Sequence, residues 1–308
     1  MPSNSNIIFF VLCLLVCSLL SCESDFEVKT SYEKKMVLNA DITPTQNIKV
    51  LLTENRSSTN NNALTIIKDA LMTLTVNDTL MLPVVYTPNN PDSVNNSGYY
   101  IADYMPKPKD KITLHASHPN FPTVSSTEYL PSPFLLTNYY PISHPIPKDK
   151  SLPAIVHIEF DDPAGSDYYL LDMWYIYSVK LYDSIQDQYY FQNDYYFGRN
   201  EEIDGLTFTP TLWGNNMFDD HSFENQKVSF NVKITNPIKP KSGNKLYLYI
   251  DCRRVSLAYF LYEKTFALSQ DEQYNPFKEP VFVYNNVQNG YGVTKSWVGD
   301  FRQIVLVE

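Results

Sequence analysis

The chain has 308 residues, in which 34 acidic side chains outnumber 24 basic ones and leave a formal net charge of −10. Proteins that bind nucleic acid neutralise phosphates with lysine and arginine, so this acidic balance argues against a nucleic-acid partner. The length suits two domains or one large one.

The amino-terminal segment predicts export and lipid attachment. An apolar run over residues 7–20 has the length of a signal-peptide core and is short for a membrane span. It ends in LLSC, which resembles the motif that bacterial lipoprotein signal peptidase reads, with Cys22 as its last residue. We therefore expect a signal peptide over residues 1–21, a lipid on Cys22 and a polar tether over residues 22–32. An ordinary secretory cleavage site before an incidental cysteine is the alternative.

The next part of the chain predicts short β-strands. Apolar residues alternate with polar ones, as in residues 71–76 and 112–116, and turn-forming residues separate these runs. About seven such runs precede a proline-rich stretch over residues 141–153, which is the number typical of an immunoglobulin-like or prealbumin-like sandwich. We expect this sandwich over residues 33–145, and a linker or crossing segment at the prolines.

A larger antiparallel β domain with one short helix is expected over residues 150–308. Residues 227–235 and 245–252 alternate cleanly, and the second run places Cys252 on its apolar face. Once Cys22 carries lipid, Cys252 is the one cysteine left, so it predicts a buried thiol and no disulfide. Residues 256–272 predict the helix. Its proposed cap is Ser256, and its proposed inner face is Leu257, Phe260, Leu261 and Leu268.

The chain contains no motif that assigns an enzyme activity, a cofactor or a metal. It lacks the Gly-x-Ser-x-Gly, phosphate-loop and His-Glu-x-x-His patterns, so we expect a protein that is not an enzyme. His115 and His118 are three residues apart and in a strand point to opposite faces, so they are not expected to bind one metal ion together. Two acidic stretches could hold a cation, and the second could also serve acid–base work, but such stretches more often mark a turn and a solvent loop. These stretches contain Asp161, Asp162 and Asp167, and Asp219, Asp220, His221 and Glu224.

Tyrosine supplies the strongest hint of a recognition surface. The chain has 24 tyrosines and five Tyr-Tyr pairs. Neighbouring side chains of a strand point to opposite faces, so each pair should send one ring inward and one outward. The densest stretch is 187–200, and we take Tyr189, Tyr190, Tyr195, Tyr196 and the nearby Trp213 as the candidate surface. The alternative is that tyrosine serves only as a good strand former.

The stretch NPFKEPVFVYNNVQNGYG over residues 275–292 resembles the carboxy-terminal signature of a Bacteroidetes lipoprotein family, domain of unknown function 4249. On physical grounds this stretch is structural, with Phe277 fixed to the core and a tight turn in which Gly290 and Gly292 take positive φ. The resemblance implies a two-domain β lipoprotein at the outer membrane, often encoded beside a TonB-dependent transporter. We therefore expect an accessory or ligand-binding partner of such a transporter in nutrient uptake. The alternative is a surface adhesin or a structural envelope lipoprotein.

Overall fold

A computed structural model describes residues 33–56, 64–89, 98–142, 154–197, 200–203, 209–211, 216–234, 245–272 and 281–307. Residues 34–308 form one compact unit. The signal peptide, Cys22, the tether, Trp213 and Phe277 lie outside the described residues.

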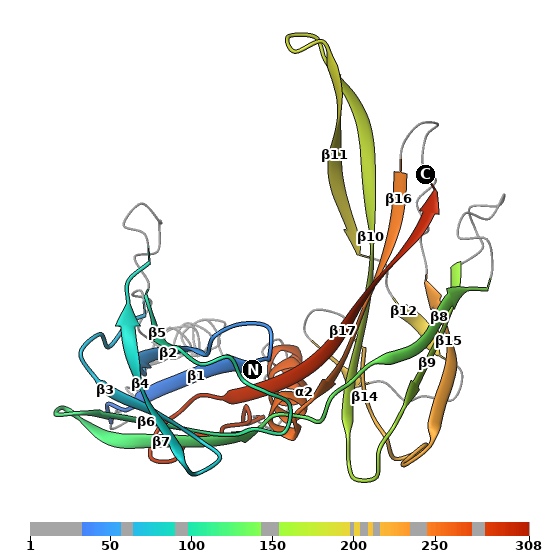
Figure 1. The fold of residues 1–308 in the computed structure, drawn as a ribbon. Helices are drawn as coiled ribbons and strands as arrows, with labels where there is room; N and C mark the ends of the chain where they lie inside the picture. Colours follow the sequence, from blue (N-terminus) through green and yellow to red (C-terminus); the bar gives the residue numbers. More distant parts are fainter. Residues whose placement is uncertain are drawn as a thin grey trace, which may run out of the picture. The chain divides into compact units, whose positions relative to one another are not determined.

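The fold is mostly β, as the alternating runs predict. A thirteen-stranded sheet runs in the order β13-β14-β10-β16-β17-β1-β2-β5-β4-β3-β6-β7, with β11 beside β10 (Figure 1). A second sheet has the order β12-β15-β9-β8 and is antiparallel. The large sheet is mixed because β1 and β17 pair in parallel, with Asp41 opposite Lys295.

The strands of the first part of the chain are β1 (Met36–Ile42), β2 (Lys49–Glu54), β3 (Leu71–Val76), β4 (Leu80–Thr87), β5 (Tyr99–Ala102), β6 (Lys111–His118), β7 (Phe121–Tyr129) and β8 (Leu136–Pro141). The later elements are β9 (Ala154–Asp161), β10 (Tyr168–Asp183), β11 (Gln188–Phe197), β12 (Asn200–Ile203), β13 (Thr209–Pro210), β14 (Asn216–Asp219), β15 (Lys227–Ile234), β16 (Lys245–Val255), α2 (Leu257–Glu272) and β17 (Thr294–Val307).

One apolar core lies against strands β1 to β7. Met72, Leu74 and Val76 are buried on the predicted face of β3, and the matching face of β6 is buried as well. The carboxy-terminal segment joins the two ends of this group of strands, because Tyr291 bridges to Val37 of β1 and Gln288 bridges to Ser125 of β7. The sheet therefore encloses its core through residues far apart in the sequence.

Two glycines of the carboxy-terminal segment, Gly290 and Gly292, lie so close to β1 that a side chain would not fit. Gly292 has a φ of 116°, as predicted, and a Cβ there would lie 2.1 Å from the carbonyl oxygen of Leu38. The prediction of positive φ at Gly290 is wrong, since Asn289 takes that conformation with a φ of 58°. A Cβ on Gly290 would instead meet the Met36 oxygen at 2.6 Å. Close approach to β1 thus explains both glycines.

A second core lies between the small sheet and strands β10, β16 and β17. Val228, Phe230 and Val232 contribute from β15, and Cys252 is fully buried on the predicted face of β16. Phe134 and Leu136 also pack into this second core, although they precede the proline-rich stretch in the sequence. The antiparallel pairing expected for residues 150–308 holds for β9 to β16, while β17 adds the parallel pair with β1.

Helix α2 is the one helix among the described residues, and its start is as predicted. The backbone N–H of Tyr259 donates to the Ser256 hydroxyl at 3.2 Å, which is an N-cap. The predicted inner face is partly wrong, because Leu257 and Leu268 are 48% and 44% exposed. The side that packs inward carries Ala258, Tyr259, Phe260 and Glu263, since α2 lies against β17 at a rotation that periodicity alone does not determine. No helix in the described ranges is long and apolar enough to cross a membrane.

Candidate functional site

The hairpin of β10 and β11 carries the predicted aromatic surface. Its turn is held by Asp183, whose carboxylate accepts the backbone N–H of Ile185 at 2.8 Å and that of Gln186 at 3.2 Å. Asp187 supplies a left-handed residue with a φ of 51°, and the Tyr182 hydroxyl donates to its carboxylate. Short polar residues that bond their own turn explain why the chain reverses here.

In the outer half of this hairpin, β10 pairs with β11 but has no described strand along its other edge. The pairing of β16 with β10 begins at Ser178, and β11 pairs with β10 out to Asp183 (Figure 1). Tyr182 faces Tyr189 in the register, with ring centroids 5.1 Å apart, and Lys180 lies 4.4 Å from the Tyr189 ring. These contacts order the rings without burying them.

Aromatic side chains are exposed on both faces of the hairpin. Tyr189 is 65% exposed and Tyr190 is 46% exposed, although they point to opposite sides. The expectation of one inward ring is therefore wrong for this pair, because no second layer of described residues covers either face. The expectation is right for the pairs Tyr99-Tyr100 and Tyr168-Tyr169, because the second ring of each pair is buried and the first is more exposed.

The other proposed residues are placed less completely. Tyr195 and Tyr196 lie in β11 opposite Ile176 and Tyr175, nearer the body of the sheet, and the described structure stops at their backbone. Trp213 lies outside the described residues. Among the hairpin side chains that the structure describes, the exposed aromatic residues are Tyr182, Tyr189, Tyr190 and Phe191, and we call them the hairpin surface.

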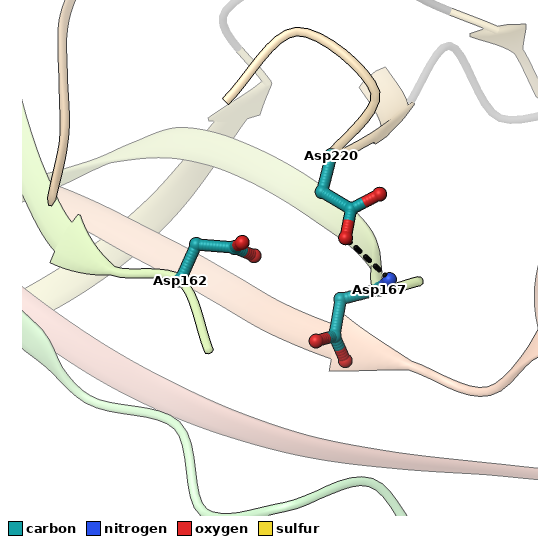
Figure 2. Close-up of side chains that lie close together, drawn as sticks. All are labelled: Asp162, Asp167 and Asp220. Carbon is teal, nitrogen blue, oxygen red and sulfur yellow. Dashed lines mark hydrogen bonds between the residues drawn. The ribbon is translucent and has the colours of Figure 1, made fainter. Parts of the chain in front are cut away.

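Three aspartates from the two acidic stretches come together, which the sequence did not indicate. Asp162 follows β9, Asp167 precedes β10 and Asp220 follows β14, and oxygen atoms of all three lie within 4.8 Å of one another (Figure 2). Figure 2 shows the Asp167 backbone N–H donating to Asp220, at 2.7 Å. The cluster is the strongest candidate for a cation site among the described residues.

Neighbouring protein groups already supply hydrogen bonds and a positive charge to these three carboxylates. Asp162 accepts the Tyr169 hydroxyl and, at 2.8 Å, the backbone N–H of Asn225. Arg254, which is 2% exposed, places its Nε 3.3 Å from Asp167 and donates to the Tyr169 hydroxyl at 3.1 Å. Burial raises the pKa of Asp167, while Arg254 lowers it in part. The buried guanidinium supplies the positive charge, so the arrangement is that of a structural network that joins three loops.

A second buried carboxyl lies where β7, β17 and the start of α2 meet. Glu128 is 4% exposed, and the Ser296 hydroxyl donates to it at 2.8 Å. Burial raises the pKa of Glu128 to about 7, although hydrogen bonds from Ser256 and Ser296 lower it in part. It lines a cavity of about 340 Å³ together with Asp167 and Ser256. Sequence reasoning missed it, because a lone glutamate in an alternating strand resembles a solvent-facing one.

The histidines and the cysteine do not form a reactive site in the described residues. His118 lies 3.2 Å from Asp69, and His157 bonds Glu159 at 3.0 Å and Asn231 at 2.9 Å. Burial raises the pKa of the Cys252 thiol well above its usual range, which leaves it protonated and inert. The buried thiol is as predicted.

The match to a protein family agrees with the resemblance seen in the sequence. No curated protein matches the chain. Residues 23–298 match the family described as Domain of unknown function (DUF4249), so the match covers most of the 308 residues. The chain therefore belongs to the DUF4249 family.

Proposed function

We propose that this protein is a lipoprotein of the outer membrane that docks on a TonB-dependent transporter and assists nutrient uptake. Cys22 would carry the lipid, as LLSC predicts, and the immunoglobulin- or prealbumin-like packing of residues 33–145 belongs to the same proposal. The observation that supports docking best is the hairpin surface, where large aromatic rings stand exposed on both faces of two strands.

A surface of this kind is unusual on a protein that has no partner to cover it. Tyr189 and Phe191 lie on one face, while Tyr190 lies on the other, and all three are at least 46% exposed. Exposed aromatic clusters are uncommon unless a partner covers them, and tyrosine is enriched among the residues that dominate binding energy. Ile185 at the turn is 94% exposed, which extends the apolar surface to the tip.

The test removes the rings without disturbing either core. We expect the double variant Tyr189→Ala with Phe191→Ala, and the single variant Tyr190→Ala, to melt like the wild type, since these side chains are exposed. Each lost anchor should weaken docking by about 2 kcal/mol or more, so the transporter should no longer co-purify from detergent-solubilised outer membranes. Tyr129→Ala is the matched control, because that ring is 61% exposed on β7, outside the hairpin.

Two results would contradict the proposal. A hairpin variant that folds and still co-purifies with the transporter at wild-type yield would show that the hairpin is not the docking surface. A wild-type protein that captures no transporter, while cells lacking it lose attachment to surfaces, would favour the adhesin alternative.

A further inference from the structure

A pocket of about 410 Å³ lies on the outer face of strands β17, β1, β2 and β5, away from the first core. Alternation places Asn39 and Asp41 outward from β1, because Leu38, Ala40 and Ile42, which alternate with them, are buried. Tyr262 of α2 also lines it, so the helix forms one wall. The volume is within the roughly 300–1,000 Å³ of small-molecule sites.

Lys295, which lines the pocket, and Arg253, which lies near Asp41, are already paired. Lys295 lies 2.8 Å from Glu263 and 4.3 Å from the centre of the Tyr259 ring. Arg253 donates to both carboxylate oxygens of Asp251, at 2.9 and 3.0 Å from its Nε. Each of these two cations therefore already has a carboxylate partner.

Two opposite charges of the pocket have no such partner. Asp41 and Lys49 both line it, both are exposed, and neither has an ion pair within the described part of the chain. Burial by the surrounding walls raises the pKa of Asp41, although the residue as a whole is exposed, and Lys295 and Arg253 lower it only in part. A positive group brought beside Asp41 would stabilise its ionised form.

The remaining lining suits a ligand with a polar end and an apolar body. The Asn39 side-chain oxygen accepts the Val293 backbone N–H at 3.0 Å, which holds the amide in place and leaves its NH₂ group for a ligand oxygen. Tyr99, Tyr262 and Leu51 supply ring and aliphatic surface. Tyr262 is itself fixed by stacking on Phe266 at 5.6 Å.

We infer that this pocket binds a small zwitterion that carries one ammonium and one carboxylate, as a free amino acid does. Asp41 receives the ammonium, Lys49 and Asn39 receive the carboxylate, and Tyr99 and Tyr262 enclose the rest. A simple amine would leave Lys49 without a partner, and a simple acid would leave Asp41 without one. A neutral polyol would leave both charges unpaired. The inference does not depend on docking, because the pocket and the hairpin surface share no residue.

Calorimetry on the purified protein alone tests this inference. The probes are L-leucine, L-serine and L-glutamate, with N-acetyl-L-leucine lacking the ammonium and L-leucinamide lacking the carboxylate. We expect at least one amino acid to bind, and both leucine derivatives to bind at least about tenfold more weakly than the free amino acid. Asp41→Asn and Lys49→Met should each lower that affinity by a similar factor. Lys68→Met, a lysine exposed outside the pocket, is the matched control.

The outcomes that would overturn the inference are distinct. Binding that survives Asp41→Asn and Lys49→Met, or a derivative that binds as tightly as the amino acid, would remove the zwitterion assignment. Absence of binding by all three amino acids at millimolar concentration would remove the site. The Tyr189→Ala with Phe191→Ala variant should bind the amino acid normally, so failure of the docking proposal leaves this result unaffected.

Discussion

Glu128 should make the stability of the fold depend on pH, and one substitution should remove that dependence. The carboxyl is buried, and its pKa is raised from 4.5 to about 7 in the folded protein. Between these two values the folded state holds a proton that the unfolded state has lost. The contribution of Glu128 is therefore fully present below about pH 4.5 and is lost as the pH rises through about 7.

The size of the effect follows from the two pKa values. Each pH unit between them corresponds to 1.36 kcal/mol, so by about pH 8 the ionisation of Glu128 destabilises the folded protein by about 3 kcal/mol. Glu128→Gln keeps the shape and an acceptor for Ser296 but cannot ionise. We expect the two proteins to be similar in stability near pH 4.5, and the variant to be more stable by about 3 kcal/mol near pH 8.

Urea unfolding followed by tryptophan fluorescence at several pH values measures this difference. Glu224→Gln, in the exposed loop after β14, controls for the loss of one negative charge. Asp41, Asp167 and Asp251 also have raised pKa values, so the difference between the two proteins is the quantity to follow. A Glu128→Gln difference of the same size at both ends of the pH range would refute the argument that burial controls this carboxyl.

Substitutions elsewhere in the molecule should have further measurable effects. Gly292→Ala should destabilise by at least about 1–3 kcal/mol in urea, because φ is positive and the Cβ meets Leu38. Gly165→Ala, with a similar φ and nothing within 4 Å, should cost less. Arg254→Met should destabilise by about 3–5 kcal/mol in the same assay, because it leaves the buried aspartates without their cation. Calcium or EDTA should leave the melting temperature unchanged, since that cluster is already satisfied, and a calcium-dependent rise would contradict this. Cys22→Ser should move the protein from the membrane to the soluble fraction, and unchanged membrane fractionation and lipid labelling would exclude the anchor.

Local pattern in the sequence predicted the local structure well. Alternation identified the buried faces of β3, β6, β15 and β16, and it placed Cys252 in the core. The Ser256 cap was predicted as well. Strand alternation and helix capping can both be predicted because each depends on residues only a few positions apart. The same information could not give the rotation of α2, which is determined by the strands it packs against.

Long-range pairing was not predictable from the sequence. The parallel pair of β1 with β17 joins the two ends of the described chain, and no local pattern specifies which strands become neighbours. The approach of Asp162 to Asp220 depends on the same topology. The outward rings of Tyr189 and Tyr190 depend on whether another layer covers the hairpin, and alternation cannot report that.

The most direct test of the docking proposal is photo-crosslinking in intact cells. A photoreactive amino acid in place of Ile185, which is 94% exposed at the hairpin tip, should form an adduct with a transporter of the outer membrane. The same amino acid at Leu71, which is 72% exposed on β3, is the matched control and should form none. An adduct from the tip alone is the predicted result. No transporter adduct from position 185, or equal adducts from both positions, would contradict docking through the hairpin.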